Sequence, residues 1–321
     1  MSIKIIKPGI CSTVQDLGRT GYRSLGVGPG GVMDFFAATV ADYLVGNNEK
    51  QPVIEMHFPA AEILFQADVL LSITGGNFEA HIDHEPIEMY QSIFVQKGSV
   101  LSFRKQVSGA RVYLAIYGGM EIENWLGSYS THLKAMAGGF KGRIFKKDDT
   151  ISLTDTYVKK NSHKFFISPA VISSIYNNPN TIRCISGPEW NFVGAASEQI
   201  FLQSSFVITN QSDRMGYRLA GENLSLQNPI ELISSPVNFG TIQLLPNGQI
   251  IILMADHQTT GGYPRVASVI AADLPKLAQL QVNGKIYFQL VSFAAAEEML
   301  ISIHKTLSKI KKGCQKFYEK H

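Results

Sequence analysis

The feature that most constrains the fold is a series of short strand-like runs in residues 52–118. Apolar, β-branched and aromatic residues gather in these runs, and Gly, Asp or Pro turns separate them. The connections are too short for the crossover helices that join parallel strands. This part of the chain is therefore predicted to form a barrel or sandwich of antiparallel strands. The expected strands are 53–56, 63–65, 69–74, 78–82, 92–95, 100–103 and 112–117.

The rest of the chain repeats this theme and adds a few helices. Further strands are expected at 2–6, 181–185, 206–209, 241–245, 249–254 and 285–290, and helices at 32–45, 190–201, 266–280 and 294–312. The chain has 321 residues, and one domain per roughly 150 residues gives two. The polar stretch 155–180 is the expected junction. We predict a mainly β protein with subdomains at 1–165 and 166–321.

Three glycine-rich polar loops interrupt these elements, at 11–31, 118–142 and 256–262. The third follows a buried strand, and Gly261-Gly262 leaves its backbone free to approach a ligand closely. A helix is expected after Pro264, and a helix N-terminus favours an anionic or carbonyl oxygen. The pattern is typical of a small-molecule site at a strand-to-helix turn. A purely structural turn with threonine caps is the alternative.

An internal similarity links the first loop to two later segments. Arg19-Thr20-Gly21-Tyr22-Arg23 resembles Arg214-Met215-Gly216-Tyr217-Arg218. Gly30-Gly31 followed by a helix to Asp42 also has the spacing of Gly261-Gly262 followed by a helix to Asp273. These matches favour two related halves, with a cleft between them that gathers the loops.

Composition narrows the partners. The formal net charge of +3 is too small to indicate nucleic acid or an anionic membrane. Cys11, Cys184 and Cys314 are odd in number and far apart, which argues against a disulfide framework and for a reducing compartment. No apolar run approaches the ~18 residues of a spanning helix. A cytoplasmic protein is expected.

Several catalytic motifs are absent from the sequence. There is no G-x-x-x-x-G-K-[ST] phosphate loop, G-x-S-x-G elbow, C-x-x-C pair or H-E-x-x-H. The His81-Ile82-Asp83-His84 cluster favours a hairpin turn over a metal site, so no metal is expected. Lys134-Ala135-Met136 is not the arrangement of a biotinyl lysine, so no cofactor is expected to be bound covalently.

Taken together, the polar loops resemble the carboxyltransferase A/B-subdomain family. Its members include the C subunit of 5-oxoprolinase (the KipA type, or allophanate hydrolase subunit 2 in older naming) and part of urea carboxylase. The resemblance covers nearly the whole chain in one motif order. It rests on Val14-Gln15-Asp16-Leu17-Gly18-Arg19, Leu126-Gly127-Ser128, Ser130-Thr131, Ser212-Asp213-Arg214-Met215-Gly216, and Met254-Ala255-Asp256 with Gln258-Thr259-Thr260-Gly261-Gly262-Tyr263-Pro264.

The resemblance implies two related cyclophilin-like β-barrel subdomains with a few helices. It also implies a hydrolase active only with a B-type (KipI-like) and a lactam-handling A-type partner subunit, in ATP-dependent opening of 5-oxoproline to L-glutamate. ATP would act through the complex. Two alternatives are a regulatory protein that sequesters the B-type partner and a carboxyltransferase using biotin carried on another chain. Tyr129 stands where the family usually has an arginine, and a phenol cannot supply a fixed cationic fork.

The candidate site follows from these loops. The substrate oxygen is expected to contact Thr260 and the backbone N–H groups of Gly261 and Gly262, since donors aimed at developing charge stabilise a transition state. Arg214 would neutralise an anion, and Asp213 or Asp256 would hold Arg214 or act as a base. The alternative for each charged residue is a buried ion pair that fixes the loops. The remaining candidates for substrate binding are Gln258, Thr259, Tyr263, Ser128, Thr131, Gln15, Asp16 and Arg19, the last three with loop scaffolding as the favoured alternative.

Overall fold

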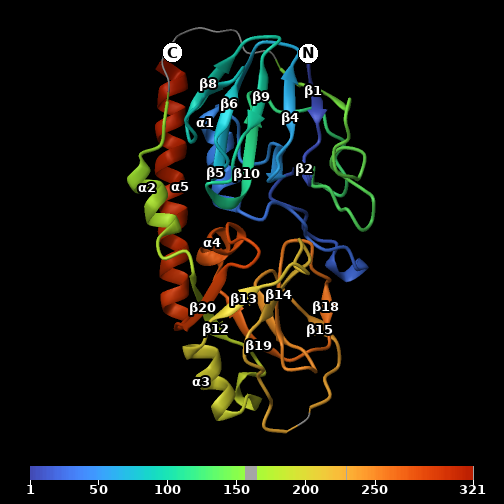
Figure 1. Cartoon of the computed structure of the whole chain (residues 1–321), viewed down its shortest axis with the longest axis vertical. Coiled ribbons are helices and arrows are strands. Elements are labelled where there is room, and N and C mark those ends of the chain that lie inside the picture. Colours follow the sequence, from blue (N-terminus) through green and yellow to red (C-terminus); the bar gives the residue numbers. More distant parts are fainter. Residues whose placement is uncertain (156–164, 229, 321) are drawn as a thin grey trace. The chain divides into compact units, whose positions relative to one another are not determined.

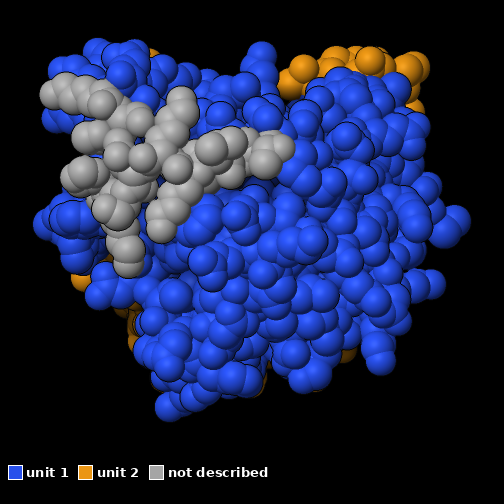
Figure 2. Space-filling view, turned by 90° about the horizontal axis from the view of Figure 1, so that it is seen from above, with its two compact units in different colours: residues 1–19, 30–174, 305–321 blue, residues 20–29, 175–304 orange. Residues whose placement is uncertain are grey.

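The computed structural model describes residues 1–155, 165–228 and 230–320 (Figure 1). The chain divides into two compact units, which Figure 2 shows in different colours. Unit 1 comprises Met1–Arg19, Gly30–Ser174 and Lys305–His321, and unit 2 comprises Thr20–Pro29 and Ile175–His304. Of the predicted junction at 155–180, residues 156–164 lie outside the described part of the chain.

Unit 1 contains two antiparallel sheets (Figure 1). One has the strand order β11-β1-β4-β9-β6-β7, and the other has the order β2-β3-β10-β5-β8. The antiparallel pairing agrees with the short connections in the sequence. The strands are β1 (Ser2–Lys7), β2 (Ser12–Gln15), β3 (Val53–His57), β4 (Glu62–Phe65), β5 (Val69–Asn77), β6 (Ala80–Ile82), β7 (Glu85–Pro86), β8 (Ser92–Val95), β9 (Val100–Phe103), β10 (Ser108–Ile116) and β11 (Thr150–Ser152).

Strand β10 shows how alternation in the sequence separates two cores. Val112 and Leu114 belong to the apolar cluster that joins residues of both sheets. Tyr113 and Ala115 point to the other face and join a second cluster with helix α1 (Phe35–Leu44). The sheet is thus covered by apolar side chains on both faces.

Helix α1 begins at Phe35, three residues after the predicted start at residue 32. Asp34 is its N-cap, and its side chain accepts a hydrogen bond from Ala37 N at 2.9 Å. The hydroxyls of Ser72 and Thr74 on β5 donate to the carbonyls of Ala41 and Ala37 in the helix. These bonds fix α1 on its sheet.

Unit 2 is a closed seven-stranded barrel with the order β12-β19-β16-β17-β14-β13-β20. Only β12 and β20 pair in parallel among the described barrel pairs. A separate two-stranded ribbon, β15 with β18, accompanies the barrel. The strands are β12 (Thr181–Ser186), β13 (Phe206–Ile208), β14 (Gly216–Ala220), β15 (Ser235–Pro236), β16 (Thr241–Leu244), β17 (Ile250–Leu253), β18 (Thr260–Gly261), β19 (Arg265–Val269) and β20 (Lys285–Leu290).

The remaining helices are short except for the last one. Helix α5 contributes residues to both units. No helix in the described ranges is both long and apolar enough to cross a bilayer. The helices are η1 (Arg23–Leu25), α2 (Pro169–Tyr176), η2 (Trp190–Phe192), α3 (Ala195–Gln203), η3 (Ala271–Asp273), α4 (Leu274–Ala278) and α5 (Phe293–Lys320).

The structure confirms the predicted mainly β class. The helix predicted at 32–45 is present as α1, and the last helix begins one residue before its predicted start and continues to Lys320. The helix predicted at 190–201 is broken, because Val193 and Gly194 are extended between η2 and α3.

The helix predicted at 266–280 is wrong in its first half. Residues Arg265–Val269 form β19, which pairs with both β12 and β16 inside the barrel. Pro275 would have removed a hydrogen bond from the interior of the predicted helix, whereas it lies in the first turn of α4. The Gly261-Gly262 turn therefore leads into a strand. The second internal match, which required a helix after both Gly-Gly pairs, is not shared.

Candidate functional site

The ribbon of β15 and β18 carries the Gln258–Gly262 loop that the sequence singles out. Pro236 faces Thr260, and Ser235 faces Gly261. Val237 N donates to Thr259 O at 3.2 Å, so these two residues form a hydrogen-bonded pair. Because hydrogen-bonded and non-hydrogen-bonded pairs alternate along an antiparallel ladder, Ser235 and Gly261 form the next hydrogen-bonded pair. The Gly261 N–H is thus engaged inside the ribbon. In the non-hydrogen-bonded pair, the Thr260 N–H points away from β15.

This loop faces solvent rather than the barrel core. Gln258, Thr260, Gly262 and Tyr263 are exposed, and Thr259 is half-buried. Two neighbouring main-chain segments converge here, one ending β17 and one forming β15. The loop therefore presents an exposed threonine, Thr260, whose backbone N–H points away from β15.

Gln243 supports the loop from the barrel, and this residue was not predicted from the sequence. It is a buried side chain on barrel strand β16, and its Nε2 donates to Tyr263 O at 3.3 Å. A Cβ added at Gly261 would lie only 2.6 Å from that nitrogen. Glycine is thus needed at 261 for close packing on Gln243. The available signal was an amide flanked by two apolar residues, Ile242 and Leu244.

Arg214 and Asp256 form a bidentate ion pair. Arg214 Nε donates to Asp256 Oδ2 at 2.8 Å and Nη2 donates to Oδ1 at 3.0 Å, with side chains 6% and 9% exposed. Asp256 N also donates to Arg214 O. The pair fixes two connections between barrel strands, which is the structural alternative that the sequence left open.

Asp213 does not contact this pair. Its Oδ1 accepts from Met215 N at 2.7 Å and Gly216 N at 3.2 Å, which closes the turn before β14. The side chain is exposed. The geometry gives Asp213 the role of a turn residue, and Asp256 is the carboxylate that holds Arg214.

The segment Thr20–Pro29 belongs to the same unit as the ribbon. Arg23 in η1 donates to the carbonyl of Val237 and, at 2.6 Å, to Asn238 Oδ1. Gly28 packs so closely on His257 that an added Cβ would lie 2.9 Å from its carbonyl oxygen. Part of the first glycine-rich loop thus meets the third loop within unit 2.

His257 is a second residue that sequence reasoning passed over. It is buried, and its Nδ1 lies 2.5 Å from Gln258 O, so Nδ1 carries the proton and Nε2 the lone pair in the neutral ring. Burial lowers the pKa of His257, and the charge of Arg23 lowers it further. A neutral imidazole therefore lies directly beside the Gln258–Gly262 loop.

Five predicted residues belong to unit 1: Gln15, Asp16, Arg19, Ser128 and Thr131. Asp16 accepts hydrogen bonds from Gly18 N, Ser128 Oγ, Tyr129 N and Ser130 Oγ, all between 2.5 and 2.8 Å. One buried carboxylate thus joins the first and second polar loops.

Gln15 and Arg19 extend this network. Gln15 Nε2 donates to Thr13 Oγ1 at 3.0 Å and to Thr131 O at 3.4 Å. Arg19 Nη2 donates to Ser130 O at 2.6 Å, and its guanidinium lies 4.7 Å from the centre of the Trp125 ring. Both side chains are buried, and these contacts agree with loop scaffolding.

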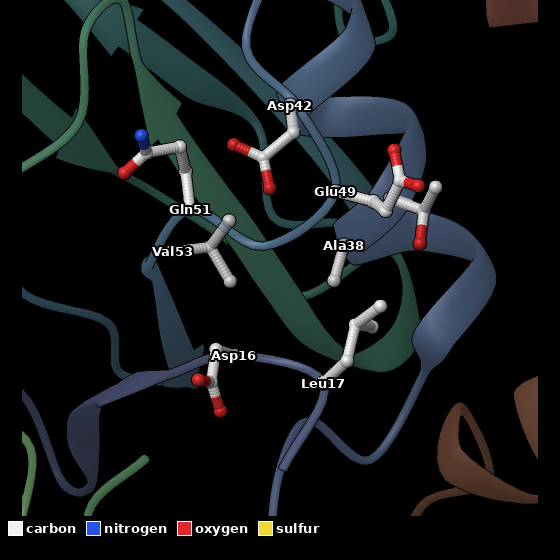
Figure 3. A pocket seen from close by; sticks show the side chains of 8 residues that line it. Asp16, Leu17, Ala38, Asp42, Glu49, Gln51 and Val53 are labelled. Atoms are coloured by element: carbon white, nitrogen blue, oxygen red, sulfur yellow. The ribbon is translucent and has the colours of Figure 1, made fainter. Parts of the chain in front are cut away.

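Unit 1 also has a shallow surface hollow beside α1 (Figure 3). It is lined by Asp16, Leu17, Ala38, Thr39, Asp42, Glu49, Gln51 and Val53. Burial strongly raises the pKa of Asp42, whose Oδ1 accepts from Asn47 Nδ2 at 3.1 Å. Lys311 donates to Glu49 at 2.9 Å, so that carboxylate is already paired.

The described residues contain no group of three His, Cys, Asp or Glu side chains placed to hold a metal. The histidine cluster at 81–84 forms a hairpin, in which Asp83 and His84 make the turn between β6 and β7 with φ of 50° and 75°. The predicted turn is confirmed.

The chain is a two-unit β protein whose barrel is accompanied by a ribbon with exposed polar side chains. Comparison with known proteins names the class: the family described as carboxyltransferase domain, subdomain A and B, matches residues 25–290. The chain belongs to this carboxyltransferase domain family.

Similar proteins bear two kinds of name. The chain is 35% identical to the 5-oxoprolinase C subunit of Haemophilus influenzae over 90% of its own length and 91% of the relative's. It is 36% identical to the 5-oxoprolinase C subunit of Escherichia coli over 89% and 90%. The structure of Kluyveromyces lactis urea carboxylase matches 98% of this chain with a TM-score of 0.88 at 27% identity, but the chain spans only 29% of that protein.

Proposed function

We propose that this chain is a subunit of an ATP-dependent 5-oxoprolinase that opens 5-oxoproline to L-glutamate. The observation that carries the proposal is the match in length: the chain corresponds to about nine-tenths of proteins named as the C subunit of 5-oxoprolinase. Hydrolysis adds water across the lactam C–N bond. The partners are a B-type and an A-type subunit, and ATP binds elsewhere in the complex.

In this proposal the lactam carbonyl lies against Thr260. Its exposed hydroxyl and its outward N–H are two donors for an oxygen that gains negative charge. Gln258 and Thr259 orient the ring, and Gly262 gives the backbone room for a close approach. Gln243 and the Arg214–Asp256 pair hold this loop in position.

The test is a reconstitution. The chain is mixed with both partner subunits, ATP and 5-oxoproline, glutamate is measured, and each component is omitted in turn. Glutamate release that requires this chain supports the proposal. Undiminished release without the chain refutes it, and binding to the B-type subunit would then support the regulatory alternative.

A substitution at Thr260 tests the placement of the lactam. Thr260→Val removes the hydroxyl with little change in shape, and losing one such donor costs roughly 10²-fold or more in kcat. Thr150→Val is the matched control, since Thr150 is exposed on β11 in unit 1. Equal turnover of the two variants would disprove the placement.

The likeness to urea carboxylase favours carboxyl transfer as a second candidate. It predicts that the chain transfers the carboxyl group of carboxybiotin, free or on a separate carrier, to an amide nitrogen of a urea-like acceptor, and that the proton of this nitrogen passes to the biotin that is released. Labelled bicarbonate, a biotin carboxylase and its carrier would detect this transfer. If no labelled product forms and glutamate is released in an ATP-dependent manner, carboxyl transfer is excluded and the 5-oxoprolinase proposal is supported.

A further inference from the structure

The ion pairs around the ribbon do not support the anion-binding role that the sequence predicted for Arg214. Arg214 was expected to receive an anion, yet its guanidinium is buried and paired in a bidentate manner with Asp256. An external carboxylate would have to displace a buried carboxylate from this fork and leave that charge desolvated without a partner.

Arg265 is the second arginine near the ribbon, and it is paired as well. Its Nε and Nη2 donate to Glu189 at 3.0 and 2.7 Å, and its Nη1 donates to Pro236 O at 3.4 Å. Through its hydrogen bond to Pro236 O, the Arg265 side chain supports β15. Its charge, like that of Arg214, is balanced by a carboxylate.

Arg23 differs from both. Its two hydrogen bonds go to uncharged acceptors, the Val237 carbonyl and Asn238 Oδ1. Within the described ranges no carboxylate forms a salt bridge with it. A guanidinium has five N–H donors, so Arg23 keeps donors for a ligand while its position is already fixed. The side chain is partly exposed.

Arg23 also contacts the ribbon one residue beyond the partner of Thr260. Val237, which it contacts, follows Pro236, and Pro236 faces Thr260 across the ribbon. One residue along a strand is about 3.4 Å. His257 nearby is held neutral by burial, so it neither neutralises nor repels a carboxylate.

We propose that Arg23 binds the carboxylate of the substrate, a small monocarboxylate whose carbonyl lies at Thr260. The identity of that ligand as 5-oxoproline rests on the proposed function. The carboxylate binds the guanidinium through charge-assisted hydrogen bonds, which are stronger than neutral ones. Arg214 then has a structural role only.

The experiment compares two ligands in the assembled complex. 5-Oxoproline and its carboxamide have the same ring, but the amide lacks the negative charge. Binding of each is titrated by calorimetry, and inhibition by the amide is measured alongside turnover. The variants are Arg23→Gln and Arg23→Lys, with Arg218→Gln as the matched control because Arg218 is exposed on β14 in the same unit.

The expected result is a selective loss. Arg23→Gln should weaken binding of 5-oxoproline about 10- to 100-fold, as expected for losing hydrogen bonds to a charged group. Binding of the carboxamide should change less than about twofold on the same scale. Arg23→Lys should recover part of the loss, and Arg218→Gln should behave as wild type. A merely structural role of Arg23 would weaken both ligands equally and would overturn the inference.

The two proposals fail in different ways. If the complex releases no glutamate but binds 5-oxoproline through Arg23, the proposed reaction is wrong and the carboxylate site stands. If the complex is active and Arg23→Gln binds both ligands as wild type does, the reaction stands and the site is wrong. If the wild-type complex binds neither ligand, the carboxylate site is refuted.

Discussion

Breaking the Arg214–Asp256 pair should destabilise unit 2 strongly. Arg214→Met leaves the Asp256 carboxylate 9% exposed and without its guanidinium. Removing one partner of a buried pair costs about 3–5 kcal/mol, because the remaining charge stays desolvated. A loss of this size corresponds to a decrease in Tm on the order of 10 °C for a unit of this length.

The double variant gives the decisive comparison. Arg214→Met with Asp256→Leu removes both charges, and replacing a buried pair by apolar side chains is often close to neutral. Most of the stability lost in the single variant should therefore return. Arg218→Met, at an exposed position on β14, should change the free energy of unfolding by less than about 0.5 kcal/mol.

Urea unfolding of the full chain measures these effects. The protein has two tryptophans, Trp125 in unit 1 and Trp190 in unit 2. In a Trp125→Phe background, fluorescence therefore reports on unit 2. The reasoning is refuted if Arg214→Met unfolds within about 1 kcal/mol of wild type and loses affinity for 5-oxoproline instead, because that arginine would then serve the ligand.

Three further predictions concern single side chains. The folded state lowers the pKa of His257, so the contribution of its neutral ring to stability is complete above about pH 6.5 and is lost as pH falls toward the folded pKa. In urea unfolding, His257→Gln should therefore make the free energy of unfolding depend less on pH between about pH 7.5 and 5.5. The control variant His304→Gln should keep the pH dependence of the wild type. Asp42 has a raised folded pKa, so its ionisation costs stability as pH rises, and Asp42→Asn should have a higher Tm than wild type at about pH 8; an equal or lower Tm contradicts this. Gly28→Ala places a Cβ 2.9 Å from His257 O and should lower the free energy of unfolding by about 1–3 kcal/mol in chemical denaturation. The control is Gly194→Ala, where the nearest atom to the added Cβ is 3.6 Å away. An effect at Gly28 no larger than that of the control would exclude the clash.

The strands were largely predictable because their local pattern and their burial agree. Alternating or continuous apolar runs such as 69–74 and 250–253 became β5 and β17. Strand β2 was missed because Ser12, Thr13 and Gln15 are polar, although all are buried. Its pairing with β3 joins residues about forty positions apart, and a local pattern carries no such information.

The sequence grouped some of the candidate residues that lie in one unit, but their pairing could not be predicted. The sequence indicated that Arg214, Asp256 and the Gln258–Gly262 loop belong together, and all lie in unit 2. It left open whether Asp213 or Asp256 holds Arg214, and it gave no sign that Arg23 has only neutral acceptors. Pairing between distant side chains depends on the closure of the barrel, which no spacing in the sequence reveals.

The assignment of Thr20–Pro29 to unit 2 affects how the protein is made. Arg23 and Val237 are 214 positions apart, so this early segment leaves the ribosome long before its binding surface exists. Contacts of such long range form late and slow folding. In a nascent chain that ends near residue 174, the segment Thr20–Pro29 has no barrel to bind. A fragment that starts at residue 175 forms its barrel without this segment.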